Sequence, residues 1–349
     1  MAIEELDWSA FPEAKRLDKV AEATAAGRVV NAGWVPPGKR TAEQQKTHER
    51  LVGEMPRFGI RGGYRLESRR YPLWKAVRSL LGKDPQWVWQ QTGSCVGAST
   101  GSAVMVAQGV EIKVNGDREE YRHPWWLYTY GRGRFHGGMR GKGEGSFGSA
   151  QAKAITTDGM FELDPEGEPD LPDPTIRSGW SVHPSGTEMD WSDGGRIAAN
   201  WLKVGKTRLF QTAAPIRSAD DMIAALANGY VCFTASMFGF SPMVPPVEGK
   251  GENQVRLVRR WNGSWSHQMF DVEFWDHPDL GPIFGKGNQW GPTAHNPGGE
   301  TPSGYPNCMY YVTYELQDKI LKHSDTEAFA LSGYDGFPAR EPELDWSAF

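Results

Sequence analysis

The chain has 349 residues, of which 39% are hydrophobic, and a net charge of −5. This length allows one two-lobed domain or two small ones with a large core. The acidic balance does not favour nucleic acid or an anionic membrane as a partner, and no apolar run approaches the roughly 20 residues that cross a bilayer.

Residues 1–70 are expected to form an N-terminal arm. Thr41 and Gln44 have the spacing of a capping box and predict a short helix that runs to about Val52. The first residues show no signal-peptide pattern, and only three cysteines occur, so we expect synthesis in the cytoplasm without disulfides.

A turn and a helix are predicted around Cys95. Gly93 and Ser94 supply the turn, and residues 95–108 are mostly small and apolar, which favours a buried helix. A thiol at a helix N-terminus lies near the positive end of the helix dipole and near unpaired backbone N–H groups, which favour the thiolate. Cys95 is therefore a candidate nucleophile, the alternative being a buried structural thiol.

A third helix, followed by a strand, is predicted over residues 218–236. Ser218 is a suitable N-cap, residues 222–228 form the helix, and Gly229 ends it. The strand runs from Tyr230 to Ser236.

A histidine and an asparagine follow, each in a distinct context. His267 lies at the start of a β-rich run, residues 266–275, and Asn288 opens the sequence Asn-Gln-Trp-Gly after a short apolar run. An imidazole can act as the base for a thiol, and a carboxamide can hold that imidazole in one tautomer. The order Cys95, His267, Asn288 thus indicates acyl transfer through a thiol.

In order and context, these three motifs resemble those of the papain-like cysteine peptidases, over roughly residues 71–316. The resemblance implies an α+β, two-lobed fold, with a helical lobe around the Cys95 helix and a β-barrel-like lobe that carries His267 and Asn288. Residues 317–349 are expected to form a C-terminal arm that begins with a short helix reaching to Ala328.

The resemblance also implies a role for each site residue. Cys95 is the nucleophile, His267 the base and Asn288 the residue that orients the base. The family's oxyanion glutamine would fall at Trp89, so Gln90, one position later, is the candidate donor, and Gln91 is a weaker one.

Three functions fit these residues. The first is a papain-like cysteine peptidase acting on a protein or peptide substrate. The second is a catalytically silent papain-fold structural protein, and the third is an amidase or transglutaminase-like acyl transferase. No cofactor is expected, and the irregular spacing of His277, His295, His323 and Cys308 does not predict a metal site.

The heptapeptide Glu-Leu-Asp-Trp-Ser-Ala-Phe occurs twice, at residues 5–11 and at residues 343–349. Exposed Leu, Trp and Phe reduce solubility unless they dock, so both copies are predicted to be docking peptides, the alternative being that both pack on their own domain. The predicted anchors are Leu6, Trp8, Phe11, Leu344, Trp346 and Phe349.

Two docking peptides on one chain suggest an assembly. Together with the tryptophan-rich loops and the disulfide-free papain-like pattern, they resemble virion-associated proteins of tailed bacteriophages. The expected partners are therefore further copies of the chain or neighbouring virion proteins, with no nucleic acid and no membrane.

Overall fold

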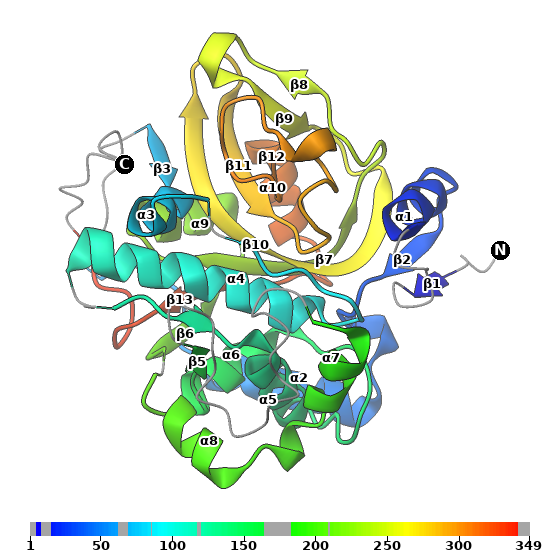
Figure 1. The fold of residues 1–349 in the computed structure, drawn as a ribbon, viewed down its shortest axis with the longest axis vertical. Coiled ribbons are helices and arrows are strands. Elements are labelled where there is room, and N and C mark those ends of the chain that lie inside the picture. Colours follow the sequence, from blue (N-terminus) through cyan, green and yellow to red (C-terminus); the bar gives the residue numbers. More distant parts are fainter. Residues whose placement is uncertain are drawn as a thin grey trace.

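The computed structural model describes residues 5–7, 15–61, 69–84, 86–116, 120–163, 183–208 and 210–340. Most helices gather in one lobe and most strands of a large sheet in the other, with the long helix α4 (Cys95–Val110) and the long strand β10 (Gly263–His277) side by side between them (Figure 1). This arrangement confirms the predicted α+β class.

The helices in the described ranges are α1 Arg16–Ala25, α2 Ala42–Glu54, α3 Trp74–Leu81, α4 Cys95–Val110, α5 Trp126–His136, α6 Gly148–Thr157, α7 Ser185–Trp191, α8 Ala199–Gly205, α9 Ala219–Ala227 and α10 Tyr314–Leu321. The strands are β1 Glu5–Asp7, β2 Val29–Asn31, β3 Arg70–Pro72, β4 His123–Pro124, β5 Glu162–Leu163, β6 Thr212–Pro215, β7 Cys232–Gly239, β8 Val247–Glu248, β9 Val255–Val258, β10 Gly263–His277, β11 Gly281–Gly287, β12 Met309–Thr313 and β13 Glu327–Ser332.

Helix α4 is the core helix of the molecule. It begins at Cys95, as predicted, and all of its residues are buried. A helix that is apolar or small on every face belongs in an interior. Its glycines let neighbours approach, because a Cβ at Gly97 would lie 2.4 Å from Tyr130 and one at Gly101 would lie 2.5 Å from Trp126.

Strand β10 is a long inner strand of the sheet. It pairs antiparallel with β7 and β11, and the sheet continues as β6-β13-β7-β10-β11-β12-β9-β8. Strand β2 pairs parallel with the start of β10, at Ser264–Ser266, and β3 pairs with its far part, at Glu273–Trp275. Strand β10 therefore joins β2 and β3 to the main sheet.

Two predicted helix starts are confirmed by their caps. Gln44 N donates to Thr41 Oγ1 at 3.2 Å and Thr41 N donates to Gln44 Oε1 at 2.9 Å, which completes the capping box of α2. Ser218 Oγ accepts from Asp221 N at 3.1 Å at the start of α9.

The large sheet includes strands from both regions that were expected to be terminal arms, residues 1–70 and 317–349. Ala328, expected in a helix, lies in β13, which inserts between β6 and β7 and is buried along its whole length. Residues 29–31 likewise belong to the sheet through β2. Apolar runs as short as β13 are ambiguous in sequence, and here the sheet neighbours decide the conformation.

No helix in the described part of the chain combines the length and the apolar character needed to cross a membrane.

Candidate active site

Cys95 is the first residue of α4, and its side chain has no solvent exposure. Burial raises the pKa of the thiol to about 12, while the backbone N–H groups of Gln268, Trp34, Val96 and Cys95 itself act in the opposite direction. The sulfur is therefore surrounded by donors that suit a thiolate, but water is excluded from it.

His267 lies in β10, opposite Ser236 of β7. Its Nε2 atom is 2.8 Å from Asn288 Oδ1, and its ring stacks on Trp290 with centroids 4.6 Å apart and an interplanar angle of 21°. Burial lowers the pKa of the imidazole to about 3. The structure thus brings together His267, Asn288 and Trp290.

A second histidine fixes the orientation of Asn288. His295 Nδ1 lies 2.7 Å from Met243 O, which can only accept, so Nδ1 carries the proton and Nε2 is an acceptor. Asn288 Nδ2 then donates to His295 Nε2 at 2.8 Å, and Asn288 Oδ1 accepts from His267 Nε2. His267 therefore keeps its proton on Nε2 and a lone pair on Nδ1.

The free nitrogen of His267 is not hydrogen-bonded to the Cys95 sulfur. His267 Nδ1 is buried and has no hydrogen-bond partner among the described residues. The backbone N–H of Gln268, the residue after His267, is the largest of the groups that oppose the rise in the pKa of the Cys95 thiol. Catalytic hydrogen bonds in unliganded sites are often long and tighten only with substrate.

Glu188 of α7 holds the turn that precedes Cys95. Its carboxylate accepts from Gln91 N at 2.7 Å, Thr92 N at 2.8 Å, Thr92 Oγ1 at 2.7 Å and Ser94 Oγ at 2.6 Å. Burial raises the pKa of Glu188 to about 7, and these four donors partly offset that rise. Sequence reasoning missed Glu188, because nothing near it in the chain marks a contact with residues 91–94.

The side chains of Gln90 and Gln91 point to different places. Gln90 Nε2 donates to Ala32 O and to Thr92 O, both at 2.9 Å. Gln91 Oε1 instead accepts from Arg16 of α1 at 3.0 Å. In this arrangement both amide protons of Gln90 are occupied, one of them by a carbonyl of the N-terminal segment.

That segment, residues 29–36, covers Cys95, and we call it the cover segment. After β2, Ala32 N and Trp34 N donate to Ser266 O at 3.0 and 3.4 Å, and Val35 N donates to Ser146 O at 2.8 Å. Gly33 lies directly on the nucleophile turn, with a φ of +111° and no room for a side chain, because a Cβ would lie 2.0 Å from Gly93 O. The cover segment therefore passes between the 90–94 turn, Ser146 and β10.

The cover segment is anchored at its far end by Glu327 of β13. Trp34 Nε1 donates to Glu327 Oε1 at 3.2 Å, and the guanidinium of Arg40 forms an ion pair with the same carboxylate. Ser149 N donates to Glu327 Oε2 at 3.0 Å, and His48 Nδ1 lies 3.5 Å from that oxygen. The Arg40 guanidinium also lies over the ring of Phe147, 4.7 Å from its centroid.

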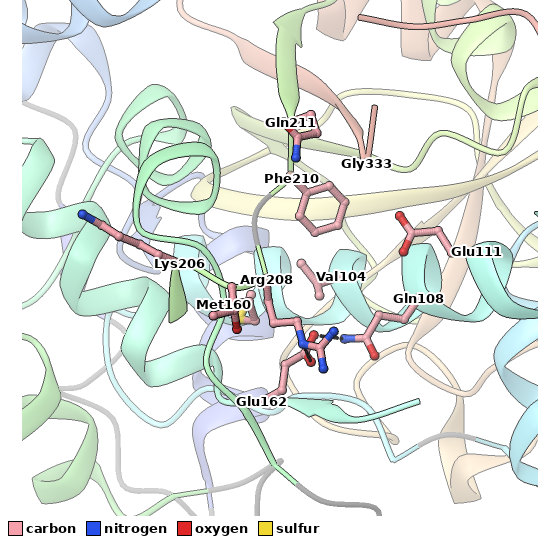
Figure 2. A pocket seen from close by; sticks show the side chains of 11 residues that line it. Val104, Gln108, Glu111, Met160, Glu162, Lys206, Arg208, Phe210, Gln211 and Gly333 are labelled. Atoms are coloured by element: carbon pink, nitrogen blue, oxygen red, sulfur yellow. Dashed lines mark hydrogen bonds and ion pairs between the residues drawn. The ribbon is translucent and has the colours of Figure 1, made fainter. Parts of the chain in front are cut away.

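A pocket of about 280 Å³ lies away from these residues, beside the C-terminal half of α4. Figure 2 shows Gln108 and Arg208 reaching toward Glu162, while Lys206 points away. Gln108 Nε2 donates to Glu162 Oε1 at 3.1 Å and Arg208 Nε lies 3.3 Å from Glu162 Oε2. Gln108 and Arg208 thus share the Glu162 carboxylate, and the pocket is lined by none of Cys95, His267 and Asn288.

Of the predicted docking anchors, Leu6 lies in β1 and packs against the core. The other five lie outside the described residues: Trp8, Phe11, Leu344, Trp346 and Phe349.

No protein-family model matches the sequence, and no curated protein matches it in sequence. Among solved structures, procathepsin L 3 from the larval midgut of Tenebrio molitor is similar, with a TM-score of 0.50 and 9% identity over 92% of this chain and 88% of that one. Xylellain, a cysteine protease from Xylella fastidiosa, gives a TM-score of 0.46 with 15% identity over 81% and 88% of the two chains. Procathepsin B S9 from Trypanosoma congolense gives 0.42 with 12% identity over 85% and 82%. The similarity to procathepsin L 3 shows that this chain has the papain-like fold.

Proposed function

We propose that this chain is a cysteine peptidase of papain-like fold whose nucleophile is held under the cover segment. The observation that carries the proposal is the hydrogen bond between His267 Nε2 and Asn288 Oδ1 beneath Trp290, because it leaves Nδ1 free as a base. The Cys95 sulfur lies at the start of α4, next to the N–H of Gln268.

In the proposed reaction His267 Nδ1 takes the thiol proton and the Cys95 thiolate attacks a peptide carbonyl carbon. His267 then protonates the leaving amine, and water hydrolyses the thioester. The Cys95 N–H and Gln90 Nε2 are the proposed oxyanion donors. The bond from Gln90 to Ala32 O supports this role, since it shows that the amide can reach a peptide carbonyl in the cover segment.

The cover segment accounts for the neutral state of the Cys95 thiol and the His267 imidazole. Burial raises the Cys95 pKa and lowers the His267 pKa, so with the cover in place the thiol and the imidazole are both uncharged. Displacing residues 29–36 lets water and substrate reach the sulfur, which moves both pKa values back toward their ordinary range.

The test compares two glycine substitutions within one stretch of chain. Gly33→Ala places a methyl group against the backbone of Gly93, whereas a Cβ at Gly38 meets nothing within 4 Å. We expect a peptidyl acyloxymethyl ketone to label Cys95 about tenfold faster in Gly33→Ala than in Gly38→Ala, which corresponds to a change of about 1.4 kcal/mol in the opening equilibrium. Labelling is located by mass spectrometry.

The same probe separates the rival functions. Labelling that is lost in Gly33→Ala/His267→Ala supports an enzyme, whereas labelling that is absent or does not depend on His267 indicates a silent scaffold. If a peptide library incubated with Gly33→Ala yields new free carboxylates, the enzyme is a peptidase. Isopeptides or transferred acyl groups instead identify an acyl transferase.

A further inference from the structure

The first copy of the repeated heptapeptide occupies an edge of the sheet. Residues Glu5–Asp7, its first three, form β1 and pair parallel with β2 in the register Glu5↔Val29, Leu6↔Val30 and Asp7↔Asn31. The side chain of Leu6 packs against the core, and Asn31 Nδ2 donates to Asp7 Oδ1 at 2.9 Å. The edge of β2 that holds the first copy, which we call the seat, is therefore defined by main-chain pairing, one apolar contact and one polar contact.

The second copy carries the same residues for the same seat. Glu343, Leu344 and Asp345 repeat Glu5, Leu6 and Asp7 letter for letter, and the four following residues are also identical. An edge that accepts the first copy through backbone hydrogen bonds accepts the second copy equally well, since both offer the same donors, acceptors and side chains.

The second copy cannot reach the β2 of its own molecule. Gly33, two residues after β2, lies beside Gly93 at the N-terminal end of α4. Asn228, to which Arg340 N donates, instead precedes Gly229, which lies beside Val110 at the other end. A helix of 16 residues is about 24 Å long. The three residues from Arg340 to Glu343 span at most about 11 Å.

Arg340 is also fixed at that distant end. Its N–H donates to Asn228 Oδ1 at 3.0 Å, next to the end of α9, and its guanidinium lies over the rings of Tyr230 and Tyr334. In Figure 1, α9 and β2 lie on opposite sides of the molecule. The chain that leads to the second copy therefore starts far from the seat.

We infer that the edge of β2 is a docking site for residues 343–349 of a second molecule of this chain, which replace the resident first copy in the same register. Leu344 takes the place of Leu6, and Asp345 takes the place of Asp7 beside Asn31. The contact joins different surfaces of the two molecules, so repetition builds a ring or an open chain of copies. This inference does not depend on the proposed peptidase activity.

The test measures binding of a fluorescent peptide of residues 341–349 to the dilute full chain by anisotropy. We expect saturable binding, and none with a peptide of the same composition in scrambled order. In the Asp7→Ala chain, where the resident copy has no carboxylate facing residue 31, Asn31→Asp places a carboxylate opposite Asp345 alone and is expected to weaken peptide binding roughly threefold to fivefold. Asn200→Asp, which adds the same charge at an exposed position of α8, is the matched control and is expected to change nothing.

Competition with the resident copy provides the second arm. Leu6→Asp weakens the seated first copy and is expected to tighten peptide binding, and Asp7→Ala, at an exposed position, does the same without altering the core. In sedimentation experiments the full chain associates as its concentration rises, and a chain ending at Arg340 does not. Equal binding of the scrambled peptide, an unchanged affinity when Asn31→Asp is added to the Asp7→Ala chain, or association of the shortened chain would each overturn the inference.

Discussion

Asn288 and His295 are joined by a hydrogen bond of 2.8 Å between Nδ2 and Nε2, and this bond decides which way the Asn288 carboxamide faces. The oxygen is left for His267, so the protonation of the proposed base is set by a residue that does not touch it. His295 is in turn held by Met243 O.

His295→Ala removes the acceptor for Asn288 Nδ2. The carboxamide can then rotate and present its nitrogen to His267, which no longer has a fixed tautomer. Since a positioned base is worth roughly 10²–10⁴ in rate, we expect the labelling rate of Cys95 in a Gly33→Ala background to fall about tenfold. His295→Gln, which keeps an acceptor, should restore part of it, and exposed His323→Ala is the control. An unchanged rate in His295→Ala would show that Asn288 orients the imidazole unaided.

Arg40→Ala is expected to loosen the cover segment. It leaves the Glu327 carboxylate buried without its guanidinium, and breaking a buried pair in this way costs about 3 kcal/mol. We expect faster labelling of Cys95 together with a lower free energy of unfolding, measured by chemical denaturation. Lys46→Ala, at an exposed position of α2, should change neither. Destabilisation without faster labelling would mean that the anchor at Glu327 does not control access to the sulfur.

Glu188→Ala leaves four donors of the 91–94 turn without their acceptor. Because a buried donor without a partner costs about 1–3 kcal/mol, we expect a loss of several kcal/mol in the free energy of unfolding. Glu188→Gln keeps one carbonyl acceptor and should lose less. Exposed Glu300→Ala serves as the control for both variants.

Acid should destabilise the folded chain. Burial lowers the pKa of His267 to about 3 and those of His295 and His48 to about 4, so the unfolded chain binds protons below about pH 6.5 that the folded chain does not. Each of these histidines then lowers the free energy of unfolding by about 2 kcal/mol between pH 7 and pH 5. Glu188 acts in the opposite direction, because its raised pKa gives stability as the pH falls from about 7 to 4.5. The three histidines together lower the free energy of unfolding by more than Glu188 raises it.

The check is chemical denaturation at pH 7 and pH 5. We expect the free energy of unfolding to change less between pH 7 and pH 5 in His267→Gln than in the unmodified chain. His323→Gln, at an exposed position, should leave the difference unchanged. A free energy of unfolding that rises toward pH 5 would contradict the assignment of neutral, buried imidazoles.

Local patterns were sufficient to predict the elements that carry the candidate site. Small apolar residues after Gly93-Ser94 predicted α4, and the β-rich run at His267 predicted the middle of β10. Caps at Thr41 and Ser218 have strictly local causes and were also predictable.

Contacts between distant parts of the chain were not predictable in this way. Glu188 lies 94 residues after Ser94, and Glu327 lies 287 residues after Arg40, so neither pairing leaves a periodic trace in the sequence. The cover segment carries few side-chain signals, because it is held mainly by its backbone and by the absence of a Cβ at Gly33. Ala328 was wrongly assigned because short buried strands and helices share a composition.

Strand β10 carries the backbone partners of the cover segment, Ser264–Ser266, immediately before His267. The strand that holds residues 29–31 in place therefore also carries the imidazole. Access to the sulfur and alignment of the imidazole therefore depend on one strand, so substitutions that loosen residues 29–31 from β10 are expected to change both.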